Sequence, residues 1–355
     1  MKCTTVGLFL SASLSAQMQW TVPSAYSGQD ADVSLCLAGV GGTLRQQIVI
    51  GQGHLQPLVG HSLTALVFRR EVAPEAFLPG SCDITVQLAQ GTVTPQNTQQ
   101  TYAANLGAAP ATVHTGPVVF PASAGTQSTP AWTASDTVRI PFSTPFAYTG
   151  GSLVIDLIGT ESLQGSAWWL VDATSEEISG TTQSLGSACS EFSDSQADTA
   201  FVNPRDLVPG GTICHLGQGR AFHLGVLVLG APAGAPIPLA MLGVPATPDC
   251  TCQINPSMIL ATMATMFLPS PSPLVPQSFG IAQVDLQLPA QSWMLSMNLA
   301  SQWIDLPTFK ASNGVLSTVA NRLPTLDMAI VVGSPNEPKG RLNLQVAPVV
   351  RFEYQ

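Results

Sequence analysis

The residue types that most often perform acid–base or nucleophilic chemistry are sparse and scattered in this sequence. The five histidines lack the His-x-x-x-His and His-x-His spacings that bring two imidazoles to one metal ion; they are His54, His61, His114, His215 and His223. The segment Gly60-His61-Ser62-Leu63-Thr64 approaches the nucleophile elbow of serine hydrolases, but Thr64 stands where that motif has glycine. A strand pattern follows it rather than a helix. We therefore interpret it as a turn and expect no enzymatic site.

Cysteine is the second residue type whose spacing could do chemistry. Besides Cys3, six cysteines are spread along the chain: Cys36, Cys82, Cys189, Cys214, Cys250 and Cys252. An even number in an exported chain favours disulfides over a metal site. Cys189 and Cys214 flank an acidic segment, so we expect them to pair, and Cys36 and Cys82 are the next candidates. A bond between Cys250 and Cys252 would need a tight turn at Thr251, and that pairing stays open.

The acidic segment itself is a candidate for calcium. It runs from Glu176 to Asp206 and includes Glu191, Asp194 and Asp198 at spacings of three and four. Calcium takes six to eight oxygen ligands, but the Asp-rich loop with its central glycine does not occur here. A solvated loop without a cofactor is the preferred interpretation, with calcium as the alternative.

Trp168 and Trp169 are the aromatic residues best placed to bind a ligand. Neighbouring side chains of a strand point to opposite faces, so one ring should enter the core and the other should face outward. An exposed indole is a stacking surface for a sugar ring. The pair therefore predicts a glycan-binding site at Trp168 and Trp169, unless the acidic segment covers the outer ring.

The N-terminus indicates where these residues are found. Residues 1–16 combine Lys2, a short apolar stretch from Val6 to Leu14 and small residues ending at Ala16, as a secretory signal does. Loss of Lys2 leaves 11 basic against 21 acidic residues, a net charge of −10. Such a chain is a poor partner for nucleic acid. The apolar stretch is too short for a transmembrane segment, so we expect secretion.

Short strands separated by turns must position all of these residues. Only 9% of the residues are charged, whereas glycine and proline number 31 and 29, which is typical of turn-rich β proteins rather than of long helices. Two-residue alternation predicts strands at 63–69, 82–88, 137–142, 153–158 and 168–171. A long loop over 172–198 then leads to further strands at 220–230, 238–243, 252–254, 284–288, 293–299, 327–332 and 342–354, while the apolar run 258–268 fits a buried strand or a helical turn. The prediction is all-β: two consecutive antiparallel β-sandwich domains of jelly-roll or immunoglobulin-like type, at 17–202 and 203–355.

Several of these segments resemble secreted bacterial two-module β-sandwich surface proteins that form large paralogous families. The first unit carries Phe68-Arg69, Asp83 to Leu88, Ala104-Asn105-Leu106-Gly107 and Pro145-Phe146-Ala147-Tyr148, and the second carries Gly234-Ala235-Pro236, Cys250 with Pro256, and Ser312-Asn313-Gly314. The chain departs from the pattern in having Pro-Asp before Cys250 and in Cys252. The resemblance implies secretion and two sandwiches, and it brings no catalytic residues.

These observations favour a secreted, non-catalytic structural, adhesion or surface-matrix protein of the cell surface, whose partners would be glycans or other surface proteins. The alternative is a carbohydrate-binding protein that uses an exposed tryptophan platform. A third reading is an extracellular hydrolase whose site is assembled from residues distant in sequence; two carboxylates in one cleft would favour it.

Overall fold

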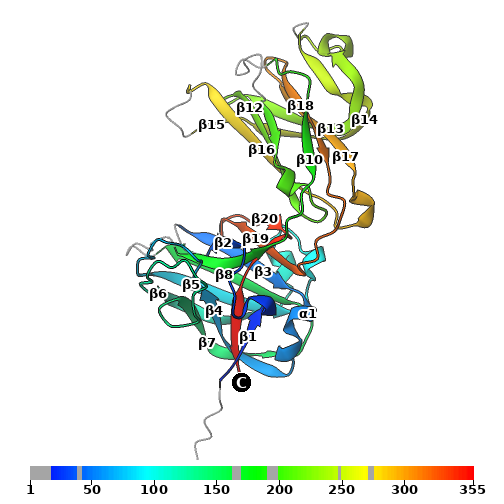
Figure 1. Ribbon diagram of the computed structural model, residues 1–355. Coiled ribbons are helices and arrows are strands. Elements are labelled where there is room, and N and C mark those ends of the chain that lie inside the picture. The colour runs from blue at the N-terminus through cyan, green and yellow to red at the C-terminus, as the bar shows by residue number, and fades with distance from the viewer. Residues whose placement is uncertain (1–16, 38–41, 162–168, 190–198, 247–248, 271–275) are drawn as a thin grey trace, which may run out of the picture.

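Strands make up almost all of the regular structure. The computed structural model describes residues 17–355 except 38–41, 162–168, 190–198, 247–248 and 271–275. Within these residues every strand pair is antiparallel, and the helices are short turns. They are α1 (Gln52–Leu55), α2 (Tyr102–Leu106), η1 (Ser24–Tyr26), η2 (Gln56–Leu58), η3 (Pro95–Asn97), η4 (Pro204–Asp206), η5 (Leu239–Leu242) and η6 (Ser292–Met294). The all-β prediction is confirmed, and Figure 1 shows the strands gathered into two lobes.

Three sheets form the first lobe. The largest has the order β20 (Arg341–Asn343), β19 (Met328–Gly333), β3 (Leu44–Ile50), β8 (Leu153–Glu161), β5 (Gly80–Gln90) and β6 (Ala111–Phe120). The second has the order β1 (Met18–Val22), β22 (Val350–Tyr354), β4 (His61–Arg69) and β7 (Thr137–Tyr148). The smallest joins β2 (Val33–Cys36), β9 (Leu170–Ser175) and β21 (Val346–Pro348).

The core of the first lobe packs against both faces of β3, a strand that the sequence analysis did not predict. Ile48 and Ile50 of β3 pack with Leu66 and Phe68 of β4 in the main cluster. Val49, between the two isoleucines, joins a second cluster that includes Tyr102 and Leu106 of α2. The largest sheet is therefore buried on both faces at β3, which accounts for the continuous apolar run there.

The second lobe is a sandwich of two sheets. One has the order β10 (Thr181–Leu185), β18 (Lys310–Thr318), β17 (Asn298–Asp305), β13 (Leu224–Pro238) and β14 (Thr251–Met266). The other has the order β11 (Ala200–Val202), β12 (Thr212–Arg220), β16 (Phe279–Gln287) and β15 (Leu268–Pro269).

Two aromatic rings fill the centre of the second lobe. The ring centroids of Phe267 and Trp303 lie 5.8 Å apart. Glycines make room for them: a Cβ at Gly217 would lie 2.6 Å from Cδ1 of Trp303, and one at Gly225 would lie 2.5 Å from Cε2 of Phe267. At these positions the core requires the absence of a side chain.

The strand pairing changes the predicted boundary between the two units. The sequence assigned all of 203–355 to the second sandwich. Instead β19 pairs with β3, β21 with β9, and β22 with β1 and β4 of the first lobe. The second sandwich, with strands from Thr181 to Thr318, is therefore inserted between β9 and β19 of the first rather than following it. Figure 1 shows the red C-terminal strand back in the lower lobe beside β1.

Some predicted elements were also wrong locally. The segment 238–243 is the turn η5, which ends at Gly243 with φ 77°, and the start of 293–299 is the turn η6. The supposed loop 172–198 contains most of β9 and all of β10, and Asp172 is fully buried. The acidic residues of this region suggested an exposed loop. The sequence did not reveal that Asp172 is buried and paired with Arg69, because Arg69 lies far away in the sequence.

Polar contacts join the two lobes. Gln100 Nε2 donates to Thr212 Oγ1 at 2.9 Å, and Gln287 Nε2 donates to the backbone oxygen of Thr98 at 2.9 Å. The Arg341 guanidinium forms an ion pair with Asp206. The junction therefore contains polar side-chain contacts contributed by both lobes.

Candidate functional site

The tryptophan pair proposed as a glycan platform is described only at Trp169. Its side chain is 0% exposed, its Nε1 donates to the backbone oxygen of Pro121 at 3.0 Å, and its ring packs against Phe77 and Phe120. Trp169 thus faces the core and offers no surface for stacking. Trp168 lies outside the described residues.

The cysteines pair differently from the prediction. Cys189 forms a disulfide with Cys250, with Cα atoms 5.3 Å apart, and Cys214 is a buried thiol. The predicted Cys189–Cys214 bond is wrong because β12 carries Cys214 away from the loop that it follows in sequence. Cys252 is a buried thiol, so it is not bonded to Cys250.

The predicted Cys36–Cys82 bond is also absent. Cys36 is a half-buried thiol in β2. Cys82 lies in β5, within the main core cluster of the first lobe. The two strands belong to different sheets, which the strand-like pattern of the sequence did not reveal.

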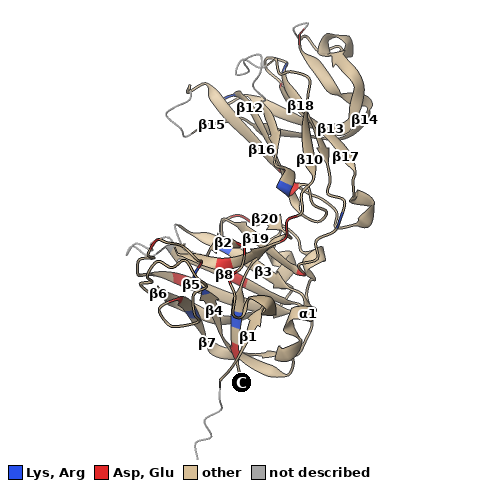
Figure 2. Cartoon of the chain, viewed as in Figure 1, with Lys and Arg blue, Asp and Glu red and all other residues tan. Residues whose placement is uncertain are grey.

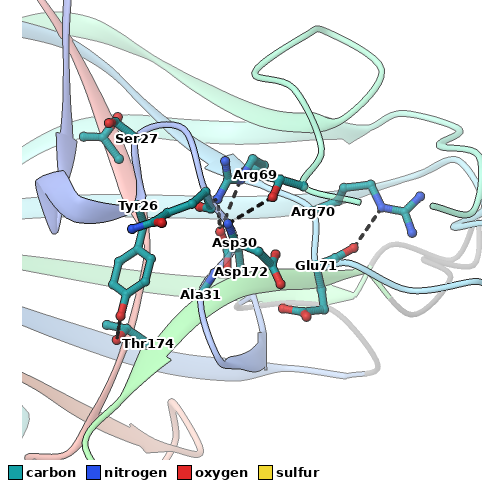
Figure 3. A network of polar contacts seen from close by, with 12 residues as sticks. Tyr26, Ser27, Asp30, Ala31, Arg69, Arg70, Glu71, Asp172 and Thr174 are labelled. Carbon is teal, nitrogen blue, oxygen red and sulfur yellow. Dashed lines mark hydrogen bonds and ion pairs between the residues drawn. The ribbon is translucent and has the colours of Figure 1, made fainter. Parts of the chain in front are cut away.

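Three carboxylates gather around a buried arginine in the first lobe (Figure 3). The Arg69 guanidinium forms an ion pair with Asp172, and both side chains are almost fully buried. Burial raises the pKa of Asp172 and of Asp30, and it raises the pKa of Glu71 to about 7 with help from the charges of Asp30 and Asp172. Among the described residues, Asp30 Oδ1 and Glu71 Oε2 have no hydrogen-bond partner.

Asp172 and Arg69 of this acidic cluster hold a neighbouring segment of the chain in place. Asp172 accepts from the Ala31 amide at 3.0 Å, and Arg69 donates to the Gln29 oxygen at 2.6 Å, so both fasten the segment that leads into β2. Asp30, Glu71 and Asp172 line none of the cavities described next. Raised carboxyl pKa values are typical of general acids, but a substrate needs access to them.

The largest of these cavities lies where the lobes meet. It measures about 630 Å³ and its lining includes Asp32, Glu176, Glu177, Arg205 and Asp206. Most of these carboxylates are engaged. Glu176 accepts from the backbone amides of residues 325 and 326 at 2.7 and 3.0 Å, Asp32 accepts from the Ser175 amide at 2.9 Å, and Asp206 pairs with an arginine. We interpret this cavity as part of the junction.

No metal centre emerges from the described residues. Among them, no group of three or more His, Cys, Asp or Glu side chains could hold a metal ion. The candidate calcium ligands Glu191, Asp194 and Asp198 lie outside the described residues. In the part of the chain that the structure describes, no helix is long and apolar enough to cross a membrane.

A smaller cavity lies beside β1 and β22, on the outer side of their sheet. Its volume is about 390 Å³, and its lining residues are Gln19, Trp20, Thr21, Ser24, Ser27 and Arg351. All but the indole and the guanidinium are neutral polar side chains. Sequence analysis missed this site, because the alternation of Val350 to Tyr354 marks Arg351 as outward-facing but does not show what it faces.

The most unusual surface of the second lobe is the hairpin of β13 and β14. We call it the apolar hairpin and define it as residues 224–266. Met258, Ile259, Leu260 and Met266 of β14 are 56, 46, 65 and 48% exposed. The apolar run 258–268 was predicted to be a buried strand or a helical turn, but most of it belongs to β14, where several of its side chains are exposed. The sequence does show that this region is unusually poor in charge, because Asp249 is the single charged residue from 221 to 284.

Strand β14 is also an open edge. It pairs with β13 and ends its sheet, with no further neighbour among the described strands. Figure 2 shows β13 and β14 almost entirely in the colour of uncharged residues. Open edges in natural proteins are normally protected by charges, prolines or coverage, because an unpaired strand recruits other strands. From Ile259 to Met266, β14 has neither charge nor proline.

Comparisons with protein-family models, with curated proteins and with solved structures found no match for this chain.

Proposed function

We propose that the protein is a secreted, non-catalytic structural or adhesive component of a surface matrix, and that it assembles through the open edge of the apolar hairpin. The observation that carries this proposal is the long exposed β14 edge without charge. The signal-like residues 1–16 support secretion. The partner that we assign to the edge is a second copy of this chain.

The charge distribution favours a second copy. The whole chain has a net charge of −9, so two copies repel each other over most of their surfaces. At β14 this repulsion is smallest. An antiparallel pairing centred on Thr262 places Met258 opposite Met266 and Leu260 opposite Ala264, so apolar side chains meet apolar ones. Such a two-fold contact joins two five-stranded sheets into one continuous sheet.

The assembly is tested by sedimentation velocity of the mature chain over a wide range of concentration. Leu260→Lys and Ala264→Glu should each weaken self-association by about tenfold or more, because each places a charge against an apolar side chain of the other copy. Mixing the two variants should restore association, since the new charges are opposite each other in the heterodimer. Val119→Lys, at a 68% exposed position of β6, is the matched control and should leave association unchanged.

A concentration-independent monomer would overturn the assembly. Association without rescue in the mixture would overturn the Thr262 register. The cellular side of the proposal is tested separately by N-terminal sequencing of the protein from culture medium or cell surface. We expect a chain that begins at Gln17, and an intact Met1 in the cytoplasm would contradict secretion.

Carbohydrate binding is the alternative function. The predicted tryptophan platform now depends on Trp168, since Trp169 is buried. A glycan array probed with wild type and with Trp168→Ala tests that form directly, and equal binding by the two proteins would exclude it.

A further inference from the structure

Arg351 is a cation without an ionic partner among the described residues. Three arginines point from the outer face of the β1–β22–β4–β7 sheet, since Arg351 pairs across to Val67, Val67 to Arg139, and Arg69 lies two residues along β4. Arg69 is neutralised by Asp172 and Arg139 by Glu353. No carboxylate forms an ion pair with Arg351 among the described residues.

The guanidinium of Arg351 is fixed in position by neutral contacts. Its Cζ lies 3.8 Å from the ring centroid of Trp132, whose Nε1 donates to the Ser27 oxygen at 2.9 Å. Its Nε donates to Thr21 Oγ1 and its Nη1 donates to Gln19 Oε1, both at 3.1 Å. These bonds use two of its five N–H groups.

Burial and a neighbouring positive charge both disfavour the protonated form of Arg351. Burial and the like charge of Arg69 lower the pKa of Arg351 to about 10, against a weaker opposite effect from Glu353. The group therefore remains charged at neutral pH while it is partly removed from water. An anion that pairs with the Arg351 guanidinium would compensate part of the interaction with water that the guanidinium loses on burial.

The cavity in front of Arg351 has the size and polarity of a small-ligand site. Its volume of about 390 Å³ falls within the range of small-molecule pockets. Ser24 and Ser27 lie on the η1 side and Gln19 and Thr21 on the β1 side. Hydroxyl and amide groups of this kind hydrogen-bond to sugar hydroxyls, and the Trp20 indole in the lining adds an apolar surface for the carbon face of a sugar ring.

We propose that this cavity binds a uronic acid residue of an acidic polysaccharide, with its carboxylate on the Arg351 guanidinium and its hydroxyls on the serine and glutamine side chains. A single planar cation suits a singly charged planar carboxylate, and bidentate pairing sets its orientation. The site lies on the first lobe, so this inference is independent of assembly through β14.

The test is isothermal titration of the mature chain with methyl β-D-glucuronide. We expect saturable binding. Methyl β-D-glucoside and acetate should each bind more weakly by about tenfold or more, because the glucoside lacks the carboxylate and acetate lacks the sugar hydroxyls. Arg351→Gln should abolish measurable binding. Arg322→Gln, which removes the same charge from an exposed position near the lobe junction, should bind like the wild type.

A second variant protects the test against loss of folding. Ser27 is exposed, and its contacts with Ser24 and Trp132 are made by its backbone, so Ser27→Glu should fold normally. Its carboxylate should occupy Arg351 and weaken glucuronide binding by about tenfold or more. Equal binding of glucoside and glucuronide, or unchanged binding by Arg351→Gln, would overturn the proposal. Acetate binding as tight as glucuronide, or tighter binding of a peptide carboxyl terminus, would also overturn it.

Discussion

His215 should make the second lobe sensitive to acid. It lies in β12, its side chain is 1% exposed, and among the described residues neither ring nitrogen has a hydrogen-bond partner. Ile213, two residues earlier on the same strand face, is part of the apolar core. Burial lowers the pKa of His215 from 6.5 to about 4, although the Asp285 carboxylate acts in the opposite direction.

The sign and size of the effect follow from proton linkage. The unfolded chain binds this proton more tightly than the folded one, so stability falls as the pH drops below about 6.5 and stops falling near pH 4. A shift of about 2.5 units corresponds to about 3 kcal/mol in full. Between pH 7 and pH 4.5 the expected loss is about 2 kcal/mol.

Replacing the imidazole isolates its contribution. His215→Leu keeps an apolar side chain of similar size and removes both unpaired nitrogens, so the variant should be more stable than wild type at pH 7 by about 1–3 kcal/mol. The gain should grow by about 2 kcal/mol at pH 4.5. His215→Gln keeps a buried polar group without the titration, and its difference from wild type should show the same pH dependence.

Urea denaturation followed by circular dichroism at the two pH values measures these differences. Every other titrating group is common to the three proteins, so its effect cancels in the comparison. A wild-type to leucine difference that is the same at pH 7 and pH 4.5 would refute the assignment of a buried neutral imidazole.

Three other stability predictions follow from contacts described above. Cys250→Ser should lower the free energy of unfolding by about 4 kcal/mol in the chain-entropy model, because the bond to Cys189 spans 61 residues; a reductant should bring wild type to the same urea midpoint, and an unaffected wild type would contradict the bond. Glu71→Gln should gain stability relative to wild type as the pH rises from about 5 to about 8, because the folded state binds the Glu71 proton more tightly and that contribution is lost as the pH passes about 7. Thermal melts at the two pH values measure it, and a constant difference would count against the raised pKa. Gly217→Ala should cost about 1–3 kcal/mol by overpacking, whereas Gly234→Ala, with no atom within 4 Å of the new Cβ, should cost far less in the same denaturation assay; equal costs would rule out the collision.

Local pattern predicted the strands well and their partners poorly. The segments 63–69 and 82–88, predicted from alternation, lie within β4 and β5. Successive side chains of a strand point to opposite faces of the sheet, so a half-buried strand alternates apolar and polar residues. Nothing local says that Val350 to Tyr354 belongs beside β1 and β4, since pairing is decided by contacts across the whole chain. The predicted domain boundary failed for that reason.

The candidate sites show the same division. Cys189 and Cys214 are the closer pair in sequence, yet Cys250 is the residue that the fold brings to Cys189. The apolar run in β14 was visible, but exposure depends on which strand ends the sheet. Arg351 stands out only when Trp132 is placed under its guanidinium, and no spacing in the sequence predicts that contact.

The insertion of the second sandwich imposes an order on folding. Strand β1 finds its partner in β22, with Met18 opposite Tyr354, 336 residues later. The inserted sandwich closes its sheets with residues 181–318 alone, so it can form while the sheet that contains β1 still lacks a strand. Contacts between residues so far apart in sequence slow folding. Until β22 is synthesised, the edges of β1 and β4 that it will pair with remain exposed to mispairing. The lobe that is synthesised first is thus the last to be completed.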